Sequence, residues 1–382
     1  MKFFRYLVYF IFLILQISAQ VEFDFSGYWV NMPVYTKVPA PISSELGIKS
    51  GIFNDINRFR LRPTVFLWDG GKISLEYEII SSAYNGNFQL VNAESINSSR
   101  QVEKLRWVAV SSKNFRMWHF IDRLYFRQNF SSSSLVVGRQ RISWGTGRIW
   151  NPTDLFNPVN PADFTKIEKD GADAVSYKYT FGSFTDAEFV YNPAEKFKKS
   201  NFAGRFRSNI GEYDFSVMGG KFDSNRVAGF DFAGNLFDAG LRGEAAVTLD
   251  KLLKYRYVKF IAGIDNQFTP ELYALIEYHF NGEGKSKASD YEIEKLASGS
   301  IINLAKNYIC LSGNYLIDPL TTLNFSATEN LDDGGGFITP SINYSLTENF
   351  FINAGLQISF GKEGSEYWYY GNSFFLKTEY YF

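Results

Sequence analysis

Short stretches in which hydrophobic and polar residues alternate recur along this chain, and turn-forming residues separate them. Alternation with a period of two is the pattern of a β-strand with one apolar and one polar face. Eighteen stretches show it, at residues 22–30, 57–68, 71–82, 117–129, 134–145, 172–181, 184–192, 200–210, 212–222, 225–235, 237–249, 255–266, 270–281, 307–316, 320–328, 337–346, 349–360 and 371–382. The pattern predicts an all-β protein.

The connections between these stretches differ in length in a regular way. The long ones all follow odd-numbered stretches, at 31–56, 83–116, 146–171, 282–306 and 361–370, whereas every connection after an even-numbered stretch is short. Outer-membrane barrels have an even number of strands, short periplasmic turns and longer extracellular loops. We therefore expect a transmembrane antiparallel β-barrel of 16–18 strands, most simply 18, in the outer membrane of a Gram-negative cell.

Both ends of the sequence fit an exported barrel. Lys2 and Arg5 precede an apolar run, and Ser18-Ala19 offers small residues for cleavage, so residues 1–19 are expected to be a signal peptide and 20–382 the barrel. Residues 374–382 alternate in polarity and end on Phe382. This end resembles the C-terminal signature of Gram-negative barrel proteins, which implies recognition by the barrel-assembly machinery. The alternative is the last strand of a soluble secreted β-protein.

Composition narrows the chemistry further. Aromatic residues make up 18% of the chain although mean hydropathy is only −0.17, as expected of a barrel whose aromatic side chains lie at the two membrane interfaces. A net charge of −1 argues against nucleic acid as a partner. Cys310 is the single cysteine, so no intramolecular disulfide can form, and only two histidines are present. We expect no cofactor and no metal.

Charged residues in several predicted strands fall on one face. An Arg or Lys that faces lipid at mid-depth costs about 2–4 kcal/mol, so we expect these side chains to line the interior. The expected pore-lining set is Arg58, Arg60, Arg62, Glu76, Glu78, Arg123, Arg127, Arg139 and Arg141. Two interpretations remain open: a water-filled pore whose basic wall favours anions, or arginines paired with carboxylates inside a plugged lumen.

Residues 138–163 form the most distinctive segment. Three Asn-Pro pairs within it restrict the backbone, so the loop should have a defined shape. It either folds into the barrel as a constriction or forms a compact extracellular cap, and its aromatic residues, which need an apolar environment, favour the constriction. The residues expected to build it are Trp150, Asn151, Pro152, Asp154, Phe156, Asn157 and Pro158.

The same segment carries a family resemblance. Gly138-Arg139-Gln140, Trp144-Gly145 and the Asn-Pro pairs around Asp154 resemble the strand and loop of porin-like outer-membrane families, including the alginate-export type and related porins. The likeness covers about residues 138–180. It implies a porin-like channel for passive diffusion of small hydrophilic solutes across outer-membrane lipid, without naming a solute or supporting a polysaccharide-export role.

Two other functions are alternatives to the channel. A barrel with a closed lumen would serve as a surface-structural or binding protein. A barrel hydrolase would need a nucleophile with a base in reach, and Ser143 and His119 qualify only by residue type. The carboxylates of Asp332 and Asp333 fit a solvated loop tip better than a cation site. We therefore do not expect an enzyme, and the sequence leaves oligomeric state and ion selectivity undetermined.

Overall fold

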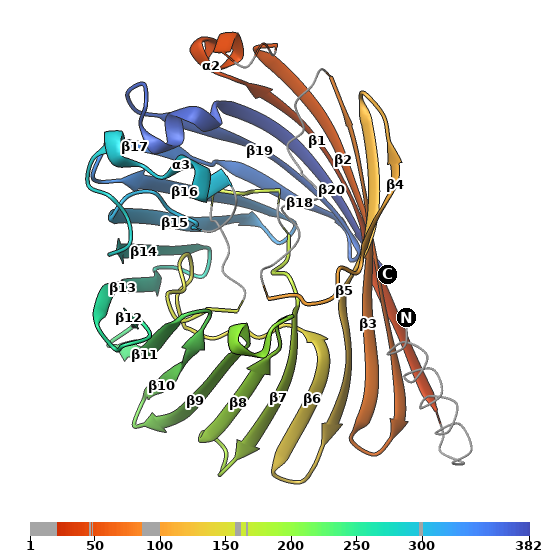
Figure 1. Ribbon diagram of the computed structural model, residues 1–382. Coiled ribbons are helices and arrows are strands. Elements are labelled where there is room, and N and C mark those ends of the chain that lie inside the picture. The colour runs from red at the N-terminus through yellow and green to blue at the C-terminus, as the bar shows by residue number, and fades with distance from the viewer. Residues whose placement is uncertain are drawn as a thin grey trace.

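The computed structural model is a closed barrel in which strands follow one another around a ring (Figure 1). It describes residues 21–45, 47, 49–85, 100–156, 162–165, 167–297 and 301–382. The expected signal peptide lies outside the described residues, as do Asn157 and Pro158 of the expected constriction. All pairs of named strands are antiparallel, and the pairing of β20 (Asn372–Tyr381) with β1 (Glu22–Lys37) closes the ring.

The other strands are β2 (Gly51–Trp68), β3 (Gly71–Tyr84), β4 (Arg106–Ser111), β5 (Phe115–Asn129), β6 (Ser133–Gln140), β7 (Ala172–Thr180), β8 (Asp186–Asn192), β9 (Asn201–Ile210), β10 (Tyr213–Phe222), β11 (Asn225–Leu236), β12 (Ala239–Leu249), β13 (Tyr255–Gln267), β14 (Leu272–Asn281), β15 (Asn307–Asp318), β16 (Thr321–Asn330), β17 (Gly335–Ile338), β18 (Ser341–Thr347) and β19 (Phe350–Phe360). The helical segments are short: α2 (Ala40–Glu45), η2 (Phe197–Lys199), η3 (Ala288–Asp290), α3 (Ile293–Ala297) and η4 (Glu366–Tyr370). Among the described residues, no helix has the length and apolar character needed to cross a membrane.

The wall of the barrel contains 18 strands in the part of the chain that the structure describes. Among the described strands β4 pairs with β5 alone and is not counted in the wall. β17 and β18 are two parts of one wall strand, because both pair with β16 and with β19. The interruption falls at Pro340, which has no backbone N–H to donate to a neighbouring strand. The predicted antiparallel barrel and its preferred count of 18 are confirmed.

Three predicted strand ends were wrong. β1 continues as far as Lys37, and β2 already begins at Gly51, because the alternation of polarity persists in both stretches. The loop expected at 31–56 is therefore only 38–50. The strand expected at 134–145 ends at Gln140, where the chain turns into the interior.

The two faces of the wall differ as expected for a barrel in lipid. On β1, Tyr28 and Val30 face inward and are buried, whereas Trp29 between them faces outward and is exposed. Phe59 likewise faces outward between Arg58 and Arg60 on β2. Apolar side chains therefore cover the outside, and charged side chains are enclosed.

The seam between the first and last strands involves the terminal residue directly. Phe382 and Gly27 exchange two backbone hydrogen bonds, of 2.9 and 3.1 Å. The Phe382 ring lies 6.0 Å from the rings of both Phe25 and Phe59. A Cβ atom on Gly27 would lie 2.3 Å from the Arg60 carbonyl oxygen and 2.6 Å from that ring, so the backbone here has room for glycine alone.

Candidate functional site: an internal loop and a charged wall

After Gln140 the chain enters the interior of the barrel, and we call the described residues of this segment, 141–156, 162–165 and 167–171, the internal loop. Figure 1 shows these residues, in yellow to yellow-green, within the ring of strands. Of its described residues, 142–156 contact inward-facing side chains of β10, β12, β14 and β15. The structure therefore places the loop inside the lumen rather than above it as an extracellular cap.

Two wall carboxylates hold the backbone of the internal loop. Glu244 on β12 accepts hydrogen bonds from the N–H groups of Thr146 and Gly147, both 2.5 Å, and from the N–H and hydroxyl of Thr153, at 3.2 and 2.8 Å. Glu277 on β14 accepts bonds from three successive N–H groups, residues 148–150, at 2.8, 3.2 and 2.8 Å. Hydrogen bonds to a charged acceptor are stronger than neutral ones, so these carboxylates fix the loop across the lumen.

The Trp-Gly-Thr-Gly sequence explains why the loop can approach so closely. Gly145 has φ of +97°, which L side chains rarely adopt, and a Cβ there would lie 2.6 Å from the Glu244 carboxylate. A Cβ on Gly147 would meet the Trp150 carbonyl oxygen at 2.0 Å. Both glycines are therefore required by the fold of the loop.

Aromatic side chains of the loop are buried against the wall. The Trp150 ring stacks on His279 of β14, with centroids 5.3 Å apart, and lies 6.0 Å from Tyr308 of β15. Phe156 packs edge to face on Trp144 and on Phe222 of β10. These apolar contacts fix the loop on two sides of the lumen.

The remaining expected loop residues shape its turn. The N–H of Asp154 donates to the Asn151 carbonyl at 3.0 Å, and Pro152 between them is buried. The Asp154 carboxylate pairs with Lys169 at 2.5 Å, which joins the two limbs of the internal loop.

A network of charges faces the returning limb of the loop from β2, β3 and β5. Arg60 is almost fully buried and lies within ion-pair distance of four carboxylates, Glu76 (3.4 Å), Glu78 (3.4 Å), Glu168 (3.1 Å) and Asp122. Glu168 comes from the internal loop and also pairs with Arg62 and with Arg123, the latter at 3.0 Å. Arg58 completes the network through Glu78 at 3.0 Å.

The formal charges of this network cancel. It contains four arginines, Arg58, Arg60, Arg62 and Arg123, and four carboxylates, Glu76, Glu78, Asp122 and Glu168. The oxygens of Glu76, Asp122 and Glu168 lie within 4.8 Å of one another, close enough for a shared cation. Arg60 pairs with all three, however, so in this structure the three carboxylates bind its guanidinium group.

Asp122 escaped the sequence analysis because of a β-bulge. The register between β3 and β5 shifts between Glu76 and Tyr77, so Asp122 and Arg123 both face inward although they are adjacent in sequence. Strict alternation would place one of them in lipid. Two adjacent charged residues inside an otherwise alternating strand could have indicated the bulge.

Arg139 does not lie on the expected face. On β6 the lumen-facing residue is Gln140, which accepts a 2.8 Å hydrogen bond from inward-facing Ser176. Arg139 lies on the alternate face beside Asp173, bonded at 2.7 Å, and donates to the carbonyl oxygens of Ile121 and Glu103. These partners satisfy the guanidinium without water, which the parity argument did not anticipate.

The other two expected arginines differ in their surroundings. Arg141 lies beyond the end of β6 and is exposed, so it is not part of a wall strand. Arg127 faces inward near the short-turn end of β5, with its guanidinium 5.8 Å from the Tyr125 ring. Among the described residues Arg127 has no carboxylate partner.

At the end of the barrel that carries the long connections, which we call the loop side, a buried carboxyl group bonds to residues that contact the internal loop. Glu366 accepts hydrogen bonds from the Tyr308 hydroxyl at 2.6 Å, from Asn330 at 2.9 Å and from the Leu304 N–H at 3.0 Å. Burial raises the pKa of Glu366 to about 7, against the opposing effect of the Tyr308 hydrogen bond. Since Tyr308 also contacts Trp150, the loop after β19 packs over the internal loop.

The sequence analysis missed the residues that position the loop. Glu244 and Glu277 each stand between apolar neighbours in alternating strands, which identifies them as inward-facing but not as acceptors for a loop 91 to 129 residues away in sequence. Glu168 carried no signal, because it lies in a stretch without periodicity.

Comparisons with known proteins give the fold. No protein-family model and no curated protein sequence matches this chain. Among solved structures, Pseudomonas aeruginosa OccD3 (OpdP) is 8% identical over 96% of this chain and 92% of its own, with a TM-score of 0.56. A triple mutant of the Rhodopseudomonas blastica porin is 11% identical over 94% of this chain and 100% of its own, with a TM-score of 0.50. The chain has the fold of a porin-type transmembrane β-barrel.

Proposed function

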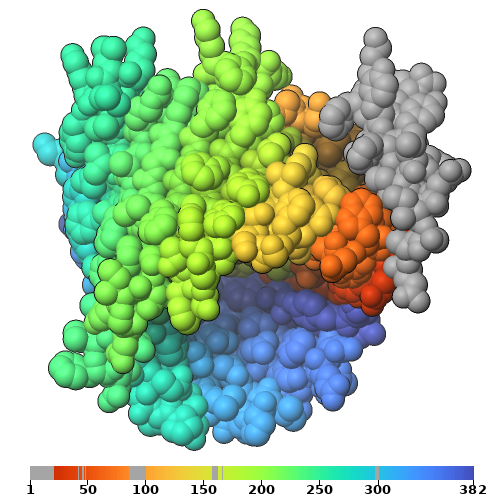
Figure 2. Space-filling model, turned by 90° about the horizontal axis from the view of Figure 1, so that it is seen from below, coloured from red at the N-terminus to blue at the C-terminus, as the bar shows by residue number. Residues whose placement is uncertain are grey.

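We propose that this protein is a passive channel for small hydrophilic solutes in the outer membrane of a Gram-negative cell. The observation that supports this most is the position of the internal loop, which crosses the lumen at mid-depth. Between the loop and the short-turn end of the barrel, polar side chains on the wall remain uncovered. Lys178, Arg207 and Lys377 line that part of the wall, with side chains 37%, 45% and 26% exposed. From below, Figure 2 shows a hollow between the blue strands and the yellow and orange strands.

The width of the barrel supports the same proposal. Barrels of 16–18 strands leave an aqueous channel unless something fills them, and the internal loop is then a constriction that limits solute size. We further propose that residues 138–180 share ancestry with the alginate-export-type porins that they resemble. We also propose that the barrel-assembly machinery reads the end of β20, where Phe382 completes the seam.

A barrel with a closed lumen is the second candidate, and one observation favours it. Three apolar clusters inside the barrel each combine wall residues with internal-loop residues, namely Phe156 on one side, Trp150 on another and Phe164 on the third. Recording ion current from purified protein in a planar lipid bilayer distinguishes the candidates. Discrete conductance steps support the channel, and an electrically silent, folded barrel supports the closed lumen.

Ion preference should depend on arginines outside the balanced network, and we propose Arg127 as one of them. Arg127→Gln is expected to shift the reversal potential in a KCl gradient towards cation preference, because it removes from the lumen a positive charge that has no carboxylate partner in the described part of the chain. The shift should grow at low salt, where screening is weakest. Arg139→Gln is the control, since Arg139 is paired on the other face of the wall. Equal reversal potentials for wild type and Arg127→Gln would contradict the proposal.

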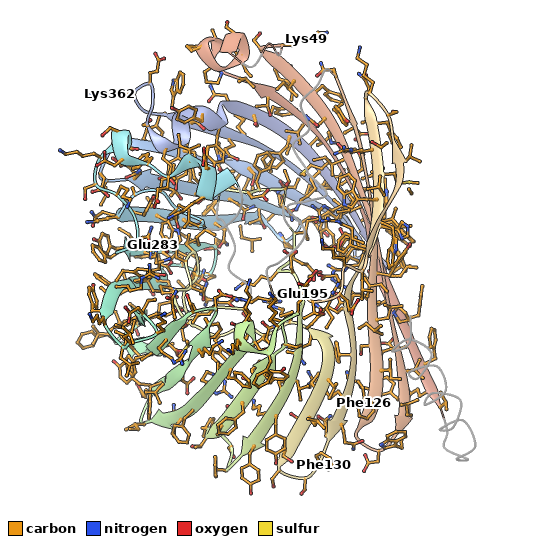
Figure 3. All side chains as sticks on the ribbon, in the orientation of Figure 1. Lys49, Phe126, Phe130, Glu195, Glu283 and Lys362 are labelled. Atoms are coloured by element: carbon orange, nitrogen blue, oxygen red, sulfur yellow. The ribbon has the colours of Figure 1, made fainter. Side chains whose placement is uncertain are left out.

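The orientation in the membrane gives a further prediction. Figure 3 shows Lys49 and Lys362 at one end of the barrel and Phe130 at the other. Lys49→Cys and Lys362→Cys should react with a membrane-impermeant maleimide on intact cells, whereas Ser131→Cys should react only after the outer membrane is opened. Cys310 is buried and should give little background. Equal labelling of all three variants on intact cells would refute this orientation.

A further inference from the structure

Four asparagines form a row on the lumen face of neighbouring strands, below the internal loop. Asn314 of β15 stands directly opposite Asn324 of β16, and Asn343 of β18 stands directly opposite Asn353 of β19. Asn324 faces Ser341, two residues from Asn343 on the same face of β18, so the two pairs are diagonal neighbours. All four side chains are partly exposed. With strands about 4.8 Å apart, the row is about 14 Å long.

These amides differ from the other inward-facing asparagines of the barrel. Asparagines near the loop side are buried and hydrogen-bonded to protein groups, namely Asn192, Asn201, Asn281 and Asn330. Within the described ranges, no protein group bonds to the side chains of Asn314, Asn324, Asn343 or Asn353. The row therefore presents unused donors and acceptors to the lumen.

The surroundings of the row are polar but largely uncharged. Neighbouring inward-facing residues on β15, β16 and β18 carry hydroxyl groups: Ser312, Thr322, Ser326, Ser341 and Ser345. Tyr273 of β14 stands opposite Asn314 at one end of the row. At the other end Lys377 stands opposite Asn353, with its ammonium group 3.1 Å from Glu379. The charged network of β2, β3 and β5 occupies a different arc of the wall.

We propose that this asparagine row binds uncharged polyhydroxylated solutes, such as oligosaccharides, on the way through the channel. Each amide offers two N–H donors and one carbonyl acceptor, and each sugar hydroxyl can both donate and accept. Side chains directly opposite on paired strands have Cβ atoms about 4.5–5.5 Å apart, so one solute can bond several amides at once. The inference rests on the proposed channel function and names the class of solute.

Direct binding tests the row without depending on conduction. Saturation-transfer NMR with maltotriose, on the detergent-solubilised barrel, should show binding to wild type that weakens about tenfold in Asn324→Leu/Asn343→Leu, since leucine keeps the volume but removes the hydrogen bonds. Asn209→Leu, at the short-turn end of β9, is the matched control and should bind as wild type does. Heat-modifiable migration verifies folding, and Asn324→Ser/Asn343→Ser replaces the leucine pair if that pair does not assemble.

The outcomes separate the two proposals. Absence of maltotriose binding to folded wild type, or equal binding to the double variant, overturns the row as a sugar site. Row-dependent binding of gluconate as strong as that of maltotriose overturns the preference for uncharged solutes. If sugar binding depends on the row but no ion current appears in a planar bilayer, the channel function fails while the binding surface stands.

Discussion

Replacing both Glu244 and Glu277 by alanine is expected to raise single-channel conductance severalfold. The two carboxylates accept seven hydrogen bonds from the internal loop, and hydrogen bonds to charged groups contribute about 1.5–3 kcal/mol each. Without these acceptors the backbone of residues 146–153 loses its anchors at mid-depth. Loop fluctuation should then widen the path and add noise to the open-channel current in planar bilayers.

A matched control separates loop release from loss of lumen charge. Glu379 also faces the lumen but pairs with Lys377, and it accepts no hydrogen bond from the backbone of the described loop residues. Glu379→Ala should change selectivity modestly and leave conductance and noise near wild type. If the Glu244 and Glu277 double variant conducts as wild type does, the apolar packing of Trp150 and Phe156 is sufficient to hold the loop.

Arg60→Met is expected to lower the free energy of unfolding by about 3–5 kcal/mol. Removing one partner of a buried ion pair leaves an uncompensated buried charge, which costs far more than the pair contributes. Here Glu76, Glu78, Asp122 and Glu168 would all lose a shared arginine. Urea unfolding in liposomes, followed by tryptophan fluorescence, measures the loss.

Two controls for Arg60→Met are available: the same substitution at an exposed arginine, and a double variant that also removes a carboxylate charge. Arg207 pairs with Asp186 but its side chain is 45% exposed, so Arg207→Met should cost only about 0–1 kcal/mol. Adding Asp122→Asn to Arg60→Met should recover part of the stability, because one unpaired carboxylate is removed. Similar losses for Arg60→Met and Arg207→Met would show that the charged wall is hydrated rather than buried.

Most of the fold followed from local patterns. Each expected strand has a counterpart in the wall. The reason is that inward and outward positions alternate along every strand, so each strand's own sequence shows the pattern. The pattern placed Arg58, Arg60 and Arg62 on one face because mid-depth lipid excludes charge. It failed where the strand departs from period two, at the bulge of Asp122, and where a charge finds partners outside the lumen, as Arg139 does with Asp173.

The site depended on contacts between distant segments. The sequence by itself determined the barrel, its strand order and a shaped segment within residues 138–163. Only the tertiary structure decided that Glu244 and Glu277 would hold that loop, and that Arg60 would share four carboxylates. It also aligned Asn314, Asn324, Asn343 and Asn353. The physical reason is that the register between strands and the path of a loop without periodicity arise from packing and hydrogen bonds between residues far apart in the chain, which no local pattern encodes.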